Sequence, residues 1–283
     1  MKILSFLINS NIFIALVAVS LAFATGAQLG LPPRFHAYLI VIFLATLFDY
    51  NVHKFIAVYI KPGAIHIEKL RWAAEHLNLI KILVISAAAG LVLCLFFVSY
   101  KILYILTPLA MLSFLYSVPF HGKQWKFSLL GIPGMKTLLL ALVWTSATVL
   151  LPVFLTDIVS DQTSVWLIFA ERFTLIFAIA IPFDIRDIKA DAQAGIRTLP
   201  ITFGTRHALL ISNFVMAISL AFASFHYLAE NRTFIILPFS VSIGLALFFI
   251  NNRKMRSLPF YYHGILDGTI FLHGILISLG FYF

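Results

Sequence analysis

Three aspartates near residue 190 have a spacing that could hold a metal ion. Asp184, Asp187 and Asp191 follow one another at intervals of three and four residues. On a helix, this spacing places the three carboxylates on one face, about a turn apart. Like charges this close repel one another unless a cation lies between them, and Mg²⁺ binds through one or two carboxylates together with phosphate oxygens. The spacing therefore indicates either a Mg²⁺–diphosphate site or a helix end with mixed charges in water.

Basic side chains accompany these aspartates. Arg186 and Lys189 stand between the acids, and Arg197 follows them in the sequence. Guanidinium and ammonium groups donate charge-assisted hydrogen bonds to phosphate oxygens. The segment thus combines groups that suit a metal ion with groups that could bind a diphosphate directly.

The segment resembles the second aspartate motif of the UbiA-type intramembrane prenyltransferase superfamily. That motif is Asp-x-x-Asp-x-x-x-Asp, followed by Gly-x-Lys/Arg-Thr-Leu-Pro and a further glycine. The part after the acids is present as Gly195, Arg197, Thr198, Leu199, Pro200 and Gly204. The resemblance extends over essentially the whole chain. It implies that Asp184, Asp187 and Asp191 help to hold Mg²⁺ on the diphosphate of an isoprenyl donor.

The first motif of that family is only partly present. Its pattern is Asn-Asp-x-x-Asp-x-x-x-Asp, and Asp49 occupies the middle acid position, whereas Ala45, Thr46 and His53 replace the other residues. Asp49 is therefore the one candidate metal ligand here. Because Mg²⁺ prefers oxygen ligands, His53 and the adjacent Lys54 are candidates for direct contact with phosphate oxygens. The alternative is an ordinary basic pair at the membrane interface.

Two further residues gain a role from the resemblance. Tyr116 ends an apolar segment in a Tyr-Ser pair like that of the family, and Lys136 opens the next apolar segment. The resemblance implies that Tyr116 lines the substrate cavity and that Lys136 faces the diphosphate. Tyr116 could instead anchor in the aromatic belt, and Lys136 could extend to the lipid headgroups. Asp267, an ionisable group in the last apolar segment, could bind the acceptor or pair with a neighbouring helix.

The elements that must position these residues are apolar helices. Of the 283 residues, 61% are hydrophobic and 11% are charged, whereas a soluble domain has about 25% charged residues. The long apolar runs lack the alternation of membrane barrel strands. We therefore expect an all-α, polytopic membrane protein that forms a single bundle domain over residues 1–283. About nine spans are predicted, at roughly 3–25, 36–56, 77–98, 102–119, 136–156, 165–183, 207–228, 232–251 and 263–283.

The distribution of positive charge predicts the orientation of the bundle. With the N-terminus inside, 16 of the 20 Lys and Arg residues fall in cytoplasmic segments, and four, Arg34, Lys101, Arg172 and Arg232, fall in outer segments. Cytoplasmic loops collect Lys and Arg, so the aspartates are expected on the cytoplasmic face, in a bacterial inner membrane. An amphipathic segment at 65–79 is expected to lie in the interface on that side. The net charge of +9 follows from the same bias, and no nucleic-acid partner is expected.

These observations favour a Mg²⁺-dependent prenyltransferase. It would move an isoprenyl group from a polyprenyl diphosphate to an apolar, aromatic, quinone-precursor-like acceptor in the membrane. Many of the 29 phenylalanines would face lipid, while some would suit an isoprenoid tail. The incomplete first motif leaves an alternative, a catalytically degenerate homologue that binds lipid or assists assembly. A transporter is disfavoured, because the acids lie at a helix end and not at the midplane.

Overall fold

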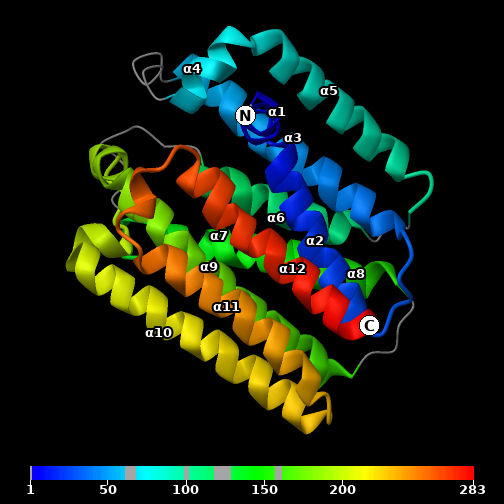
Figure 1. The fold of residues 1–283 in the computed structure, drawn as a ribbon. Coiled ribbons are helices and arrows are strands. Elements are labelled where there is room, and N and C mark those ends of the chain that lie inside the picture. The colour runs from blue at the N-terminus through cyan, green and yellow to red at the C-terminus, as the bar shows by residue number, and fades with distance from the viewer. Residues whose placement is uncertain (1, 61–67, 99–101, 118–128, 157–160) are drawn as a thin grey trace.

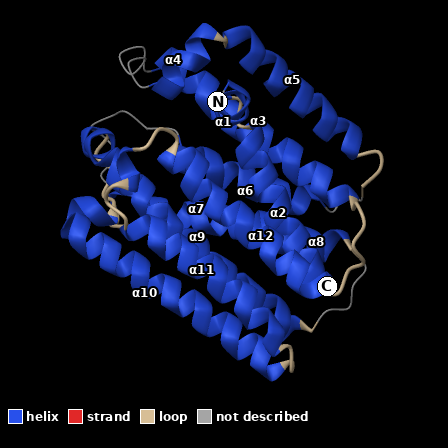
Figure 2. Cartoon of the chain, viewed as in Figure 1, coloured by secondary structure: helices blue, strands red, loops and turns tan. Residues whose placement is uncertain are grey.

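The computed structural model describes residues 2–60, 68–98, 102–117, 129–156 and 161–283, which are helical with short connections and contain no strand (Figures 1 and 2). The predicted all-α, polytopic fold is confirmed. In these ranges, seven helical runs are long and apolar enough to cross a bilayer. They are α3 (Ala37–Ile60), α5 (Leu77–Cys94), α7 (Met135–Thr145) with η3 (Ser146–Leu150) and α8 (Leu151–Leu155), α9 (Gln162–Gln193), α10 (Leu199–Ala229), η4 (Thr233–Ile235) with α11 (Ile236–Asn251), and η6 (Tyr261–Leu266) with α12 (Asp267–Tyr282).

The other two predicted spans differ from straight, full-length helices. The first is α1 (Lys2–Asn9) and α2 (Ile12–Gln28), which meet at an angle of 73° and make an eighth span if they are taken together. The second is α6 (Ile102–Ser117), whose apolar part is shorter than a full span. The prediction of about nine spans is therefore a rough count. The short helix α4 (Glu68–Glu75) lies within the predicted amphipathic segment.

Polar side chains on α3 hold the bend between α1 and α2. Asn11 has a left-handed backbone, with φ 63°, and its side chain donates to Asn51 Oδ1 at 3.1 Å. Asn51 Nδ2 donates to the carbonyl oxygen of Ser10 at 3.1 Å. Lys54 Nζ donates to the carbonyl oxygen of Asn9. These bonds satisfy backbone groups that the broken helix leaves without intrahelical partners, and they direct Lys54 toward α1.

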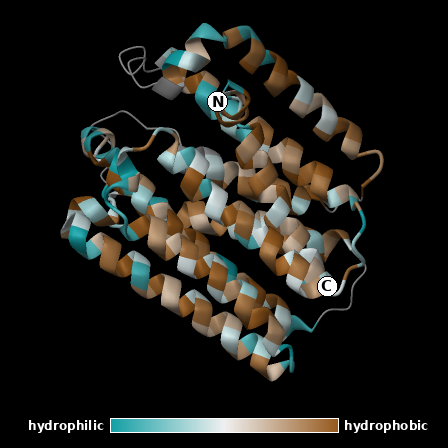
Figure 3. Ribbon diagram, viewed as in Figure 1, coloured by the Kyte–Doolittle hydropathy of each residue, from teal (hydrophilic) through white to brown (hydrophobic). Residues whose placement is uncertain are grey.

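The helices are mostly arranged side by side (Figure 1), and apolar residues predominate along them (Figure 3). Many large apolar side chains are exposed. Helix α9 packs against α7 and α10, and α2 packs against α3 and α12, whereas α5 lies at the edge of the bundle against α3. Helix α4, the turn between α9 and α10, and η5 (Met255–Ser257) share one end of the bundle. The chain segments around Gln28 and Phe283 share the opposite end. The described parts of three connections that were predicted to be cytoplasmic therefore lie at a common end.

A buried charged cluster joins three helices near that opposite end. Arg172, counted above among the outer segments, lies within α9 and is only 1% exposed, so it is not a loop charge. Its Nη1 donates to the carbonyl oxygen of Leu21 at 2.9 Å, and its Nη2 donates to Gln28 Oε1 at 3.1 Å. Gln28 Nε2 donates to Glu171 Oε1 and to the hydroxyl oxygen of Tyr227. The cluster fixes α2, α9 and α10 relative to one another.

Candidate active site

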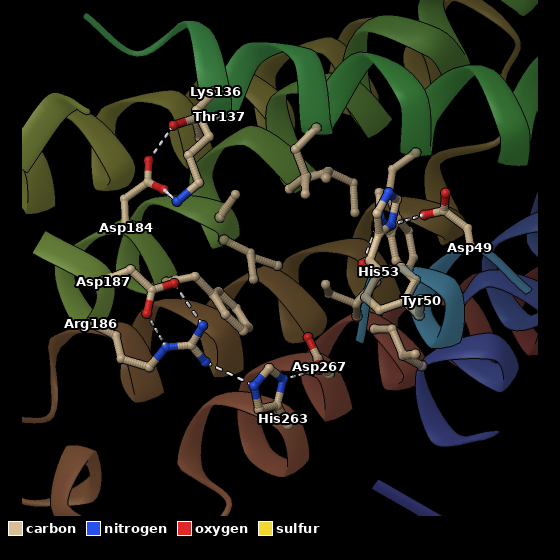
Figure 4. A pocket seen from close by; sticks show the side chains of 18 residues that line it. Asp49, Tyr50, His53, Lys136, Thr137, Asp184, Arg186, Asp187, His263 and Asp267 are labelled. Carbon is tan, nitrogen blue, oxygen red and sulfur yellow. Dashed lines mark hydrogen bonds and ion pairs between the residues drawn. The ribbon is translucent and has the colours of Figure 1, made fainter. Parts of the chain in front are cut away.

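A cavity of about 270 Å³ lies between α2, α3, α7, α9 and the start of the last helix (Figure 4). Its wall is partly apolar and partly charged. The apolar part includes Leu140, Trp144, Ile176, Ile179, Phe183 and Ile270. The charged and polar part includes Asp49, His53, Lys136, Thr137, Asp184, Arg186, Asp187, His263 and Asp267. Residues of both predicted aspartate motifs therefore face one cavity.

Lys136 places a positive charge between two of the three aspartates, which would otherwise repel one another. It opens α7, and its Nζ lies 3.4 Å from Asp184 Oδ1 and 2.7 Å from Asp191 Oδ2. Thr137, the next residue, donates to Asp184 through its hydroxyl group. Asp184 and Asp191 are both buried. Two of the three motif acids are thus held by one ammonium group from a neighbouring helix, and Asp191 is turned toward that group and is absent from the cavity lining.

The connection between α9 and α10 fixes the position of Lys136. Gly195 has a φ of 72°, which permits the turn after the last acid. The amide of Arg197 donates to the carbonyl oxygen of Leu130 at 3.0 Å, and the amide of Gly134 donates to the carbonyl oxygen of Arg197 at 3.1 Å. These bonds tie the Gly-x-Arg-Thr-Leu-Pro segment to the residues that precede α7. The Arg197 side chain is exposed and does not line the cavity, so its predicted phosphate contact would require that side chain to move.

The third acid, Asp187, lies on a more open side of the cavity. Its side chain is 33% exposed, and it accepts from Arg186 Nε at 2.7 Å and from Arg186 Nη2 at 2.8 Å. Arg186 Nη1 donates to His263 Nε2 at 2.8 Å. The guanidinium group also lies over the rings of Phe183 and Tyr262, at 5.3 and 5.0 Å from their centroids. Arg186 is therefore held in place between Asp187 and His263 (Figure 4).

The incomplete first motif faces the cavity from α3. Asp49 Oδ2 lies 3.4 Å from His53 Nδ1, and Asp49 Oδ1 accepts from Ser113 Oγ at 2.7 Å. Thr46, at another acid position of the motif, lines a neighbouring apolar cavity of about 230 Å³. Lys54 does not line the first cavity, because its ammonium group reaches the bend between α1 and α2. His53 and Lys54, which were predicted to contact the phosphate together, thus point to different parts of the structure: His53 lines the cavity and Lys54 contacts α1. The side chain of Tyr116, the other predicted cavity residue, lies outside the described residues.

Comparison with known proteins supplies the family. Residues 76–259 match the UbiA prenyltransferase family. The chain belongs to this family. A search of curated proteins found no match.

Solved structures of UbiA homologues share the fold. The homologue from Archaeoglobus fulgidus bound to GPP and Mg²⁺ is 16% identical, with a TM-score of 0.64, over 97% of this chain and 99% of that chain. The homologue from Aeropyrum pernix K1 is 19% identical, with a TM-score of 0.61, over 93% of this chain and 96% of that chain. A digeranylgeranylglyceryl phosphate synthase is 14% identical, with a TM-score of 0.57, over 99% and 98% of the two chains. At these identities the likeness concerns the fold.

The donor atoms of this UbiA member suit one Mg²⁺ ion. Asp184 and Asp187 both line the cavity, and two carboxylates with phosphate oxygens are the ligands that Mg²⁺ commonly takes. The first motif does not suit a second ion, because Asp49 is its sole acid and His53 offers nitrogen. Among the described residues, no group of three or more His, Cys, Asp or Glu side chains could hold a metal ion. A phosphate ligand would therefore complete the site.

Among the polar residues of the cavity wall, sequence reasoning about the UbiA motifs missed Tyr50, Thr137 and His263. His263 Nδ1 lies 3.5 Å from Asp267 Oδ2, four residues further along the chain. The sequence contains a signal for this pair, because residues at i and i+4 share a helix face. The contact with Arg186 has no such signal, since the two residues are 77 positions apart.

Proposed function

We propose that the chain is an intramembrane prenyltransferase that uses Mg²⁺ and moves an isoprenyl group from a polyprenyl diphosphate to an apolar, aromatic, quinone-precursor-like acceptor. One observation carries the proposal: a single cavity joins Lys136, Arg186, Asp184 and Asp187 to an apolar wall. This combination fits a donor with a charged diphosphate and an apolar tail. Family membership supports it, as do the A. fulgidus homologues bound to GPP with Mg²⁺ and to DMAPP with Mg²⁺.

The charged residues would hold the diphosphate and favour its departure. Lys136 and Arg186 would donate to its oxygens, as charge-assisted hydrogen bonds. Mg²⁺, held by Asp184 and Asp187, would neutralise charge on the leaving group. His53, at the position of an acid, would donate a hydrogen bond from a ring N–H group to a phosphate oxygen.

The apolar residues would protect the isoprenyl group. Trp144 and Phe183 line the cavity with aromatic rings, which attract positive charge through their faces. Such rings would stabilise the carbocation that forms when the bond to the diphosphate breaks. An apolar wall also limits the access of water, which would otherwise compete with the acceptor.

The proposal includes an orientation in the membrane. Alternate connecting segments carry 16 of the 20 Lys and Arg residues. Because cytoplasmic loops collect these residues, the count supports a cytoplasmic N-terminus and a cytoplasmic opening for the charged end of the cavity. A water-soluble or interfacial diphosphate headgroup would then enter from the cytoplasm, while its tail remains in the bilayer. For a bacterial protein, the membrane concerned is the inner membrane.

Purified protein in lipid nanodiscs tests the proposal. Labelled geranyl diphosphate is supplied with Mg²⁺ and a panel of phenolic acids and naphthalene diols, and both pyrophosphate release and prenylated product are measured. We expect both products in the wild type, and a loss of both in the Asp184→Asn, Asp187→Asn double variant. Wild-type protein that binds no prenyl diphosphate at any Mg²⁺ concentration would contradict the proposal. That result would favour a lipid-binding or assembly role, which the single acid in the first motif makes the second candidate.

A further inference from the structure

The last membrane helix begins with a rare turn. Residues Tyr261–Leu266 form the π-helical turn η6, and Phe260 before it has a left-handed backbone, with φ 61°. Short π-helical turns are uncommon and occur frequently at functional sites. This one carries His263, and Asp267 follows as the first residue of α12. Both side chains line the cavity, and His263 lies beside Arg186 of the second motif (Figure 4).

The contacts of His263 define the roles of its two ring nitrogens. Arg186 Nη1 lies 2.8 Å from His263 Nε2, and a guanidinium group can only donate. His263 Nε2 therefore accepts and carries a lone pair. The proton of the neutral ring is then on Nδ1, which faces Asp267 Oδ2 at 3.5 Å. A carboxylate behind one nitrogen and a lone pair on the other is the arrangement that prepares a histidine to act as a general base.

We propose that His263 is the base that accepts the proton of the prenyl acceptor, with Asp267 as its positioning residue; the inference rests on the prenyl transfer proposed above. An electron pair of the acceptor forms a bond to C1 of the isoprenyl group. The bond from C1 to oxygen breaks, and its electron pair leaves with the diphosphate. The proton on the attacking carbon or oxygen passes to His263 Nε2. The resulting imidazolium is stabilised by the Asp267 carboxylate.

Arg186 links this base to donor binding. Its Nε and Nη2 donate to Asp187 at 2.7 and 2.8 Å, while its Nη1 donates to His263 Nε2 at 2.8 Å. A diphosphate beside Asp187 offers charged oxygens, which form stronger hydrogen bonds with a guanidinium group than a neutral imidazole does. Arg186 would therefore turn to the diphosphate and leave His263 Nε2 facing the cavity. The base becomes available only when the donor is present.

The mechanism also narrows the class of acceptor. A nucleophile that loses a proton to His263 must carry that proton on the atom that attacks. Hydroxyl groups and the ring carbons of phenols satisfy this requirement. An alkene acceptor that retains all its protons does not use the base.

Variants of His263 test whether this residue acts as a base or only supports the structure. His263→Ala leaves space for imidazole in the cavity, whereas His263→Gln fills that space with an amide. We expect both variants to bind labelled geranyl diphosphate with Mg²⁺ at least as tightly as the wild type, because Arg186 loses a competing partner. We expect transfer to the phenolic panel to fall by about 10²- to 10⁴-fold, the usual contribution of general base catalysis. Added imidazole should restore part of the transfer in His263→Ala and none in His263→Gln.

Two further variants complete the experiment. His207→Gln is the matched control, because His207 is exposed on α10 and its Nδ1 lies 3.0 Å from the carbonyl oxygen of Phe203 in the same helix. It should transfer the isoprenyl group at the wild-type rate. Asp267→Asn keeps His263 in place and should lower transfer with unchanged donor affinity, and it serves as the test if His263→Ala does not fold.

The outcomes distinguish this inference from the proposed function. Transfer at the wild-type rate in His263→Ala would show that His263 is not the base and would leave the proposed function unaffected. Loss of donor binding in His263→Ala, or loss of transfer that imidazole does not restore, would also overturn it. A wild-type protein without donor turnover would contradict the proposed function, and with it the assignment of His263 as the base.

Discussion

At the scale of single residues, Lys136 holds the second motif in place before any ligand binds. Its side chain is 21% exposed, and its two carboxylate partners, Asp184 and Asp191, are nearly fully buried. Removing one partner from a buried ion pair leaves uncompensated charge and costs about 3–5 kcal/mol. Here two like charges would remain on one face of α9. Lys136 therefore stabilises the empty site as well as contributing a group for the diphosphate.

Replacing Lys136 by methionine should lower the free energy of unfolding by about 3–5 kcal/mol. Thermal unfolding in detergent measures the loss. Lys136→Arg keeps the charge and should lose less. Adding Asp191→Asn to Lys136→Met removes one of the stranded carboxylates and should recover part of the stability. Equal stability of Lys136→Met and the wild type would show that the ion pairs contribute nothing.

Asp187, which faces the cavity, should affect the ligand more than the fold. Asp187 is one-third exposed and its ionic partner, Arg186, is its neighbour in the chain, so Asp187→Asn should change thermal stability little. Losing a metal ligand should weaken Mg²⁺-dependent binding of geranyl diphosphate by about tenfold or more, equivalent to ~1.4 kcal/mol. Binding measured against Mg²⁺ concentration tests this. Unchanged affinity in the Asp184→Asn, Asp187→Asn double variant would contradict the metal assignment.

At the scale of elements, helical periodicity relates the acids of α9 to one another but not to their partners. The intervals between Asp184, Asp187 and Asp191 place them on one face of a helix, yet Asp184 and Asp187 line the cavity whereas Asp191 turns to Lys136. The partner of Asp191 lies 55 residues away, on α7, and no local pattern relates the two. The bend between α1 and α2 was also missed, although the polar residues Asn9, Ser10 and Asn11 interrupt the apolar run there. The left-handed Asn11 and the bonds from α3 break this span, and those bonds depend on tertiary packing.

The same helix geometry separates His53 from Lys54. Consecutive residues on α3 point in different directions, about 100° apart around the axis, so one faces the cavity and the other faces α1. Lys54→Met should therefore lower thermal stability by about 1.5–3 kcal/mol, the contribution of a hydrogen bond from a charged group, and leave donor affinity unchanged. His53→Ala should do the reverse. Binding and thermal unfolding of the two variants, measured side by side, test the separation, and equal loss of donor affinity in both would contradict it.

At the scale of the whole molecule, the charged part of the cavity lies toward one end of the bundle, and the C-terminus lies at the other. The start of α2 contributes Ile14 to the cavity wall. The far end of α2 lies near the C-terminus, where the Tyr282 hydroxyl group donates to the carbonyl oxygen of Leu31 at 3.0 Å. Because Arg172 belongs to the interior and not to an outer loop, one of the four positive charges assigned to outer segments is not an outer charge. The positions of Lys and Arg along the sequence could predict this asymmetry. They could not predict that Arg172 points inward, which depends on Leu21 and Gln28 of α2.

The charge asymmetry predicts how the bundle lies in the membrane. If the site end faces the cytoplasm, a fluorescent reporter fused after Gly195, in the turn between α9 and α10, should fold and fluoresce. A periplasmic phosphatase reporter should be active after Asn231, at the other end of α10, and after Phe283, because the C-terminus lies beside residues 29–31. Exchanging the reporters at the same positions supplies the control. Phosphatase activity after Gly195 would place the carboxylates on the outer face, where a donor made in the cytoplasm could not reach Lys136 and Arg186 without first crossing the bilayer.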